Sequence, residues 1–160
     1  MQEGSELYCR FEIHFPDREA LPLAKRVARF YAILWRASEN RLGRATPLLR
    51  KETVHIWLSR TGEPGGEQSG AHIYLYDIGA NRKPIEWLRE LAHEYGHYLL
   101  PGASGYSEPE NWSNGVLGER LFLQWLREDL KEAAPTSIPF GEWKDIAEYC
   151  DRQSDPLLAR

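Results

Sequence analysis

The chain has 160 residues, of which 42% are hydrophobic and 28% are charged, and its net charge at pH 7 is −4. This composition predicts a single folded domain over residues 1–160 and argues against a disordered or membrane-embedded chain. A weakly acidic chain with interspersed charges also argues against a nucleic-acid-binding protein, which would carry a basic stripe. No apolar run is long enough to predict a membrane span, and the first residues are not typical of a signal peptide.

The chain has two cysteines, Cys9 and Cys150, one near each end. A disulfide between them is compatible with an oxidising compartment, and two buried thiols are equally compatible with the sequence. The cysteines therefore favour neither an oxidising nor a reducing compartment. A signal peptide removed before Met1 would favour a secreted or periplasmic protein, and its absence would favour the cytoplasm.

The first predicted elements are a strand and a long helix. Residues 7–15 alternate between apolar and polar side chains, which is typical of a half-buried strand whose solvent face carries His14. We expect no function for that histidine. A helix then begins near Pro22, which suits a first helical turn, and runs to about Asn40, with Gly43 just beyond its end.

Two further strands are predicted in the first half of the chain. Residues 54–58 and 71–78 are rich in β-branched and aromatic side chains, and the glycine-rich run 61–70 between them is typical of a loop. The two strands and this loop predict a hairpin with a long tip. The glycines lack the flanking pattern of a phosphate-binding loop, so we interpret them as flexible connection.

The second half of the chain is predicted to be helical. A helix begins near Pro84 and ends before Pro101 and Gly102, and an irregular segment follows over residues 103–113. A second helix begins near Asn114 and is broken at Pro135. A last helix over residues 140–150 precedes a tail that we expect to be frayed. The fold class is therefore α+β, with a small sheet followed by helices.

The predicted helix at residues 84–100 carries the pattern His-Glu-x-x-His. Four residues on a helix turn through about 400°, so His93 and His97 project from one face, one turn apart. Two imidazoles in that arrangement can bind one Zn²⁺, and Glu94 beside them can accept a proton from a water on the metal. The alternative is a surface helix that carries two histidines without a metal.

Two histidines do not complete a catalytic zinc site, which usually has three protein ligands. We predict Glu119 as the third ligand because a helix gives its side chain a fixed direction. Gly115 and Gly118 leave one face of that helix bare, so another helix can approach it. The alternatives are Glu108 or Glu110 in the irregular segment, or a site with no third protein ligand.

This arrangement resembles the zincin metallopeptidases and, among them, the gluzincins, in which a glutamate follows His-Glu-x-x-His on a second helix. The order of strand, backing helix, two strands and active-site helix is similar to the zincin upper subdomain over about residues 7 to 130. The resemblance implies a zincin-like α+β fold with a small mixed sheet, one Zn²⁺ and hydrolysis of peptide bonds. Gly118 and Leu123 depart from the Asn and Asp that flank the glutamate in larger gluzincins.

A weaker resemblance links residues 93–100 to the small regulatory metallopeptidases that cleave repressor proteins. In both cases the metal site implies that Glu94 is the general base. Tyr106 or His72 could stabilise the developing negative charge. Residues 71–78, if they form the edge of the sheet, could bind the main chain of a substrate by strand addition.

We therefore expect a zinc metallopeptidase whose partner is a peptide or protein substrate. The first alternative is a zinc-stabilised interaction domain that has lost its activity. The second is an α+β binding module without a metal. Glu94 favours the enzyme, because a purely structural zinc site needs no base beside its ligands. A propeptide or an inhibitor is a further possible partner at the site. Trp112 beside it is a candidate for an aromatic cleft rim.

Overall fold

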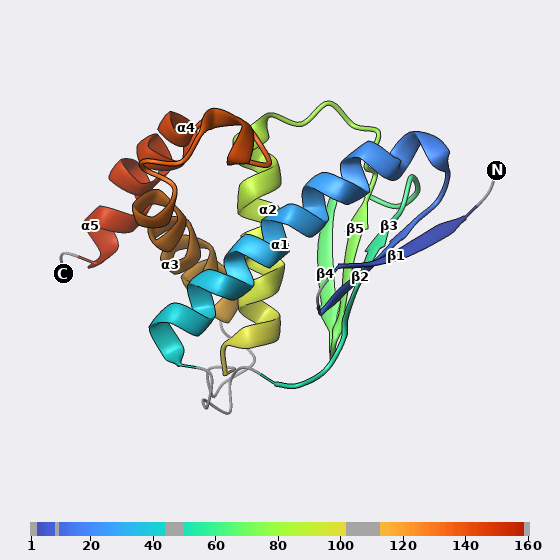
Figure 1. Ribbon diagram of the computed structural model, residues 1–160, viewed down its shortest axis with the longest axis horizontal. Helices are drawn as coiled ribbons and strands as arrows, with labels where there is room; N and C mark the ends of the chain where they lie inside the picture. Colours follow the sequence, from blue (N-terminus) through green and yellow to red (C-terminus); the bar gives the residue numbers. More distant parts are fainter. Residues whose placement is uncertain (1–2, 9, 44–49, 102–112, 159–160) are drawn as a thin grey trace. The chain divides into compact units, whose positions relative to one another are not determined.

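The computed structural model describes residues 3–8, 10–43, 50–101 and 113–158 (Figure 1). The chain divides into two compact units, Met1–Asn81 and Arg82–Arg160. The first unit contains a five-stranded sheet and a long helix, and the second contains helices. The architecture is therefore mixed α+β with a small mixed sheet, which confirms the predicted class.

The sheet of the first unit has the strand order β1-β2-β3-β5-β4. The central pairs β2–β3 and β3–β5 are parallel, and the outer pairs β1–β2 and β5–β4 are antiparallel. A single long helix, α1 (Leu21–Leu42), connects β2 to β3, as a parallel pair requires. The strands are β1 (Gly4–Tyr8), β2 (Phe11–Phe15), β3 (Val54–Leu58), β4 (Gly65–Ser69) and β5 (His72–Tyr76).

Three predictions about this sheet are wrong in detail. Residues 7–15 are not one strand, because the chain reverses between β1 and β2; apolar and polar residues alternate through the turn and hide it. The strands at 54–58 and 71–78 do not form a hairpin, since β3 and β5 are parallel. The glycine-rich run contains β4, which forms the hairpin with β5 and pairs along its outer side.

The two faces of the sheet differ in burial. On one face the apolar side chains of β2, β3 and β5 are almost fully buried, and Phe11 stacks on Tyr31 of α1 with 5.2 Å between ring centroids. Burial of each such side chain stabilises the fold by about 1.5–3 kcal/mol. The other face, which we call the open face, stays partly exposed. It carries Glu12, His14, His55, Trp57, His72, Tyr74 and Tyr76.

An ion pair joins the start of α1 to the end of β3. Asp17 Oδ1 accepts a hydrogen bond from the backbone N–H of Ala20 at 3.0 Å, just before the helix. The Arg60 guanidinium also donates to both carboxylate oxygens of Asp17, at 2.5 and 2.8 Å. The hydrogen bonds from Arg60 lower the pKa of Asp17 to about 2.

The second unit contains α2 (Pro84–Leu99), α3 (Asn114–Asp129), α4 (Trp143–Tyr149) and α5 (Asp155–Leu158). The predicted helix starts at Pro84 and Asn114 are confirmed, since α2 and α3 begin there. The predicted helix end before Gly43 is also confirmed, since α1 ends at Leu42. The predicted frayed tail is wrong, because a π-helical turn, Cys150–Ser154, continues α4 into α5.

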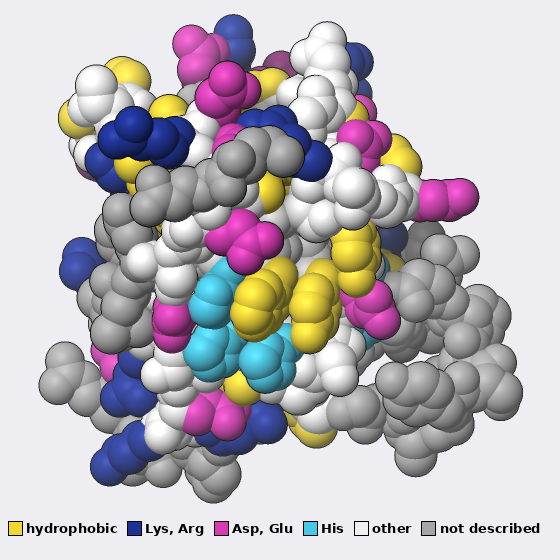
Figure 2. All heavy atoms as spheres, turned by 90° about the vertical axis from the view of Figure 1, so that its right-hand side faces the viewer, with side chains coloured by type: hydrophobic (Ala, Val, Ile, Leu, Met, Phe, Trp, Pro, Cys, Tyr) yellow, Lys and Arg dark blue, Asp and Glu magenta, His cyan; other side chains and the backbone are white. Residues whose placement is uncertain are grey.

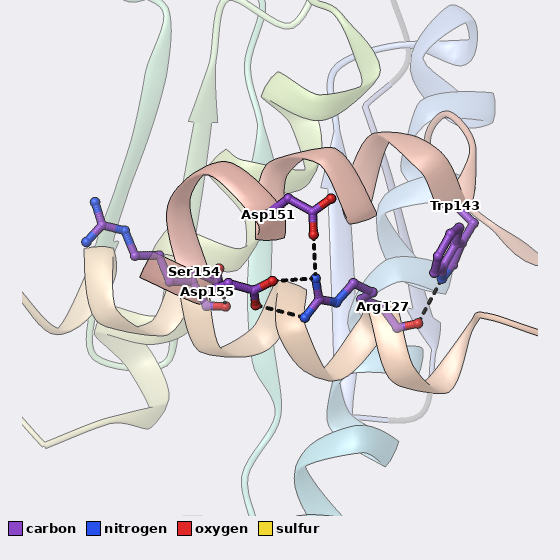
Figure 3. A network of polar contacts seen from close by, with 6 residues as sticks. Arg127, Trp143, Asp151, Ser154 and Asp155 are labelled. Carbon is purple, nitrogen blue, oxygen red and sulfur yellow. Dashed lines mark hydrogen bonds and ion pairs between the residues drawn. The ribbon is translucent and has the colours of Figure 1, made fainter. Parts of the chain in front are cut away.

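A polar network holds this C-terminal segment against α3 (Figure 3). The guanidinium of Arg127 donates to Asp155 at 2.8 and 3.0 Å and to Asp151 at 3.1 Å. The indole N–H of Trp143 donates to the backbone carbonyl of Arg127 at 2.8 Å. The hydroxyl of Ser154 donates to the carbonyl of Arg120. Because α3 supplies the partners, the tail stays helical beyond the predicted end.

Glycines set the distance between α2 and α3. A Cβ on Gly118 would lie 2.5 Å from the Cα of Gly96, and a Cβ on Gly96 would lie 2.7 Å from the carbonyl oxygen of Asn114. Real Cβ atoms do not approach backbone atoms so closely, so the two helices pack here only because both positions lack a side chain. This confirms the prediction that the glycines of the second helix allow another helix to approach.

Candidate metal centre

His93, Glu94 and His97 of α2 lie on adjoining positions of the helix and form what we call the helix group. Each offers one possible metal-binding atom, and the three atoms lie within 4.8 Å of one another. The Nε2 atoms of His93 and His97 are 3.1 Å apart. The Glu94 side chain is buried, with 4% exposure, whereas the histidines are partly exposed. The helix group therefore places two imidazole nitrogens and a carboxylate in one small volume.

Gly115 of α3 faces the two imidazoles. A Cβ on Gly115 would lie 2.5 Å from His97 Nε2 and 2.6 Å from His93 Nε2. Any side chain at this position would fill the space into which both nitrogens point. The glycines that let α3 approach α2 thus also keep the histidine nitrogens uncovered on this side.

Asn114, the first residue of α3, fixes the hydrogen position on His97. Its amide nitrogen donates to the carbonyl of Leu100 at 3.0 Å, which turns its Oδ1 towards His97 Nδ1 at 2.6 Å. Since a carbonyl oxygen only accepts, the hydrogen of the neutral His97 ring lies on Nδ1. Its Nε2 then carries the lone pair that a metal ion needs.

Glu119 lies on the other side of His93. Its side chain is buried, with 7% exposure, and its Oε1 is 4.0 Å from His93 Nδ1. Oε2 accepts a hydrogen bond from the hydroxyl of Tyr149, and Oε1 is 3.5 Å from Arg89 Nε. The structure therefore brings Glu119 to His93, but to the ring nitrogen that faces away from His97.

Two titratable groups beside the helix group have shifted pKa values. Burial, together with the negative charge of Glu119, raises the pKa of Tyr149 far above its ordinary value, so its phenol stays a hydrogen-bond donor at neutral pH. Burial also raises the pKa of Glu90, one turn before His93 on α2. Sequence reasoning singled out neither residue.

Several predicted site residues lie elsewhere. Tyr106, Glu108, Glu110 and Trp112 fall outside the described residues. His72 lies on β5 of the first unit, where its Nδ1 accepts a hydrogen bond from the indole of Trp57 at 3.0 Å. Strand addition at residues 71–78 depended on their forming the edge of the sheet, and this condition is not met, because β4 pairs with the outer side of β5. Cys150 is a buried free thiol whose pKa burial raises to about 11, and Cys9 lies outside the described residues.

Sequence reasoning also missed the roles of Asn114 and Tyr149. Asn114 was identified only as the start of a helix, although an amide at the first residue of a helix that packs on a His-Glu-x-x-His helix is a candidate partner for an imidazole. Tyr149 gives no such signal, because it lies thirty residues after Glu119 and reaches it only through the packing of α3 with α4.

The chain matches no family model, no curated protein and no solved structure. None of the helices among the described residues is long and apolar enough to cross a membrane. The function is therefore argued from the helix group and its neighbours.

The helix group fits a zinc ion. Zn–N bonds of 2.0–2.1 Å in a tetrahedral site separate two ligand nitrogens by about 3.3 Å, close to the 3.1 Å between His93 and His97 Nε2. Gly115 leaves the space beside these atoms uncovered by a side chain, and Asn114 sets the hydrogen of His97. Imidazole nitrogens are donors that zinc prefers, and a catalytic zinc site combines two of them with a third protein ligand and a water.

Proposed function

We propose that the chain is a zinc-dependent peptidase with a zincin-like fold. The observation that carries this proposal is the helix group, in which two imidazole nitrogens 3.1 Å apart lie beside a buried glutamate. His93 and His97 would hold the metal. The zinc would supply a Lewis acid that lowers the pKa of a bound water to about 7.

Glu94 is the residue we assign to proton transfer. Its carboxylate lies within 4.8 Å of the metal-binding atoms of both histidines, so a water between them is within its reach. Burial of this carboxylate keeps bulk water away from it, and a general base in such a site can accept a proton and return it to the leaving amine. A site that served only to stabilise the fold would not require it.

Glu119 is our proposed third ligand, and its neighbours suggest how it is held. Tyr149 and Arg89 both contact its carboxylate, so its negative charge is compensated inside the unit. Direct ligation would require the carboxylate to turn from His93 Nδ1 towards the Nε2 side. At 4.0 Å its Oε1 lies beyond hydrogen-bond distance of His93 Nδ1, and a shift of about 1 Å would let it accept a hydrogen bond there and orient that ring.

The alternative function is a zinc-stabilised interaction domain without activity. The packing of α2 on α3 through Gly96 and Gly118 supports it, because a metal on α2 would add to the stability of this helix pair. Cleavage of a repressor-type protein remains a narrower form of the peptidase proposal and rests on the resemblance alone.

The test is hydrolysis of a mixed peptide library by the purified full chain, followed by mass spectrometry. We expect cleavage that a chelator abolishes and added zinc restores. The Glu94→Gln variant should retain zinc and lose activity by about 10²–10⁴-fold, because only the base is removed. Glu132→Gln, an exposed substitution with the same charge change, is the control. Zinc binding without cleavage in the wild type would favour the interaction domain.

A further inference from the structure

Glu12, His14 and His55 form a second cluster, which we call the sheet group, on the open face of the first unit. Glu12 and His14 are two residues apart on β2, so their side chains project to the same side. His55 lies directly opposite Glu12 on the neighbouring strand β3. Figure 2 shows histidine side chains gathered beside hydrophobic ones on one face of the molecule.

The distances within the sheet group suit one metal ion. His14 Nε2 and His55 Nδ1 are 3.0 Å apart; Oε1 of Glu12 lies 3.9 Å from the first, and Oε2 of Glu12 lies 3.7 Å from the second. Ligand atoms around a tetrahedral zinc are separated by about 3.3 Å, so shifts of a few tenths of an ångström would close the site. The three side chains are 20–32% exposed, and an ion can therefore reach them from solvent.

Neighbouring side chains hold the rings and the carboxylate in place. The indole of Trp57 stacks on His14, with 3.8 Å between ring centroids and 7° between planes. The ring of His72 stacks on His55 at 4.9 Å. The hydroxyl of Ser5 donates to Glu12 Oε1 at 2.5 Å. The hydrogen bond from Ser5 is an outer contact of the kind that orients a metal ligand before the ion binds and raises its affinity.

We propose that the sheet group is a second metal site that binds a divalent transition metal ion of the zinc class. Two imidazoles and one carboxylate are the donor set that Zn²⁺ accepts, whereas Mg²⁺ and Ca²⁺ prefer oxygen ligands alone. The 3.0 Å contact between the rings is a hydrogen bond, and an ion between them would replace it while the hydrogen of the donor ring moves to that ring's other nitrogen. This site is independent of the helix group and of the peptidase proposal.

His72 provides a matched control on the same face. It stacks beside His55, but its Nδ1 already accepts the hydrogen bond from Trp57 Nε1 at 3.0 Å. It is also not a member of the three-residue cluster among the described residues. If surface histidines merely attracted the ion, loss of His72 would weaken zinc binding as much as loss of His14 or His55. If His14 and His55 are ligands, loss of His72 should weaken it far less.

The experiment is calorimetric titration of the full chain with zinc chloride, in a variant whose helix group is disabled by His93→Gln and His97→Gln. We expect about one zinc per chain. Adding His14→Gln or His55→Gln should weaken zinc binding more than about 100-fold, because each removes a ligand rather than an outer contact. Adding His72→Gln should change the affinity by less than about threefold.

Three results would overturn the proposal. The first is that the variant with the disabled helix group binds no zinc. The second is that its zinc affinity is unchanged after loss of His14 or His55. The third is that His72→Gln weakens zinc binding as much as these substitutions do, which would indicate surface histidines only. If the disabled variant does not fold, titration of the wild type replaces it, and the chain with His14→Gln and His55→Gln together should bind one zinc ion fewer than the wild type. Neither outcome at the sheet group changes the test of Glu94.

Discussion

The helix group and the sheet group each contain two histidines and one glutamate, but the chain assembles them differently. In the helix group the spacing along a single helix brings the side chains together, and Gly115 of α3 faces them without a side chain. In the sheet group Glu12 and His14 of β2 meet His55 of β3. His55 lies 41 positions after His14 in the chain, and the register of the two strands places it there. One group is visible in the sequence and the other only in the fold.

The surroundings of the two groups suit different tasks. Glu94 is buried beside its histidines, and a buried carboxylate at a metal is suited to accept a proton. Glu12 is partly exposed, and its hydrogen bond from Ser5 lowers its pKa, so it stays ionised and can act as a ligand. We therefore propose chemistry for the helix group and binding alone for the sheet group.

Substitution of Glu119, which has no counterpart in the sheet group, should cause the largest difference in zinc affinity between the two groups. If Glu119 is the third ligand, Glu119→Ala lowers zinc affinity of the helix group by more than about 100-fold. If it orients His93 through Nδ1, the loss is about 10–100-fold. Competition with a zinc-binding dye measures the affinity, and Glu132→Ala, which removes an exposed carboxylate elsewhere, is the control. Unchanged affinity in Glu119→Ala would remove this residue from the site.

A methyl group at the contact between α2 and α3 should disturb the helix group and spare the sheet group. The Cβ of Gly118→Ala would meet the Cα of Gly96 at 2.5 Å, and overpacking of this kind costs about 1–3 kcal/mol of unfolding free energy. Urea denaturation measures the loss. Gly79→Ala is the control, since its Cβ would approach nothing closer than 3.7 Å. Equal stability of the two variants would contradict the close packing.

Removal of the Asn114 side chain should weaken the helix group alone. Without its amide, the hydrogen of His97 is no longer held on Nδ1, and loss of such an outer partner costs about 10–100-fold in metal affinity. Asn114→Asp keeps an acceptor and should lose less than Asn114→Ala in the same dye competition. An equal loss in both would indicate a structural role at the start of α3.

The smallest effect concerns the response of the first unit to acid. The folded pKa of Asp17, about 2, lies below its ordinary value of 3.8. Because this pKa is depressed, the Asp17–Arg60 contact stabilises the fold above about pH 4 and loses that effect as the pH falls towards 2. Asp17→Asn should therefore show a shallower loss of stability between these pH values, measured by thermal unfolding. If the stability of the wild type and of Asp17→Asn fell in parallel with pH, the stabilising role of the Asp17–Arg60 contact would be contradicted.

Local patterns in the sequence predicted much of the helical part of the fold. Pro84 and Gly43 mark a helix start and a helix end because their backbone preferences act at the residue itself. The approach of α3 to α2 followed from Gly115 and Gly118, which have no side chain to separate the helices. The pair His93 and His97 followed from helical spacing alone.

Long-range pairing could not be predicted in the same way. The alternation in residues 7–15 is the same with or without a turn, and the parallel register of β3 with β5 depends on the whole sheet. The contact of Tyr149 with Glu119 and the meeting of His14 with His55 join residues far apart in the chain. Such contacts leave no periodic signal in one sequence.

The most direct test of the central claim is anomalous diffraction at the zinc absorption edge from crystals of the zinc-loaded wild-type chain. We predict an anomalous peak within bonding distance of both His93 Nε2 and His97 Nε2, with the Glu94 carboxylate beside it. Absence of a peak at these nitrogens, in crystals that show zinc elsewhere, would contradict the proposed metal centre and the peptidase function with it.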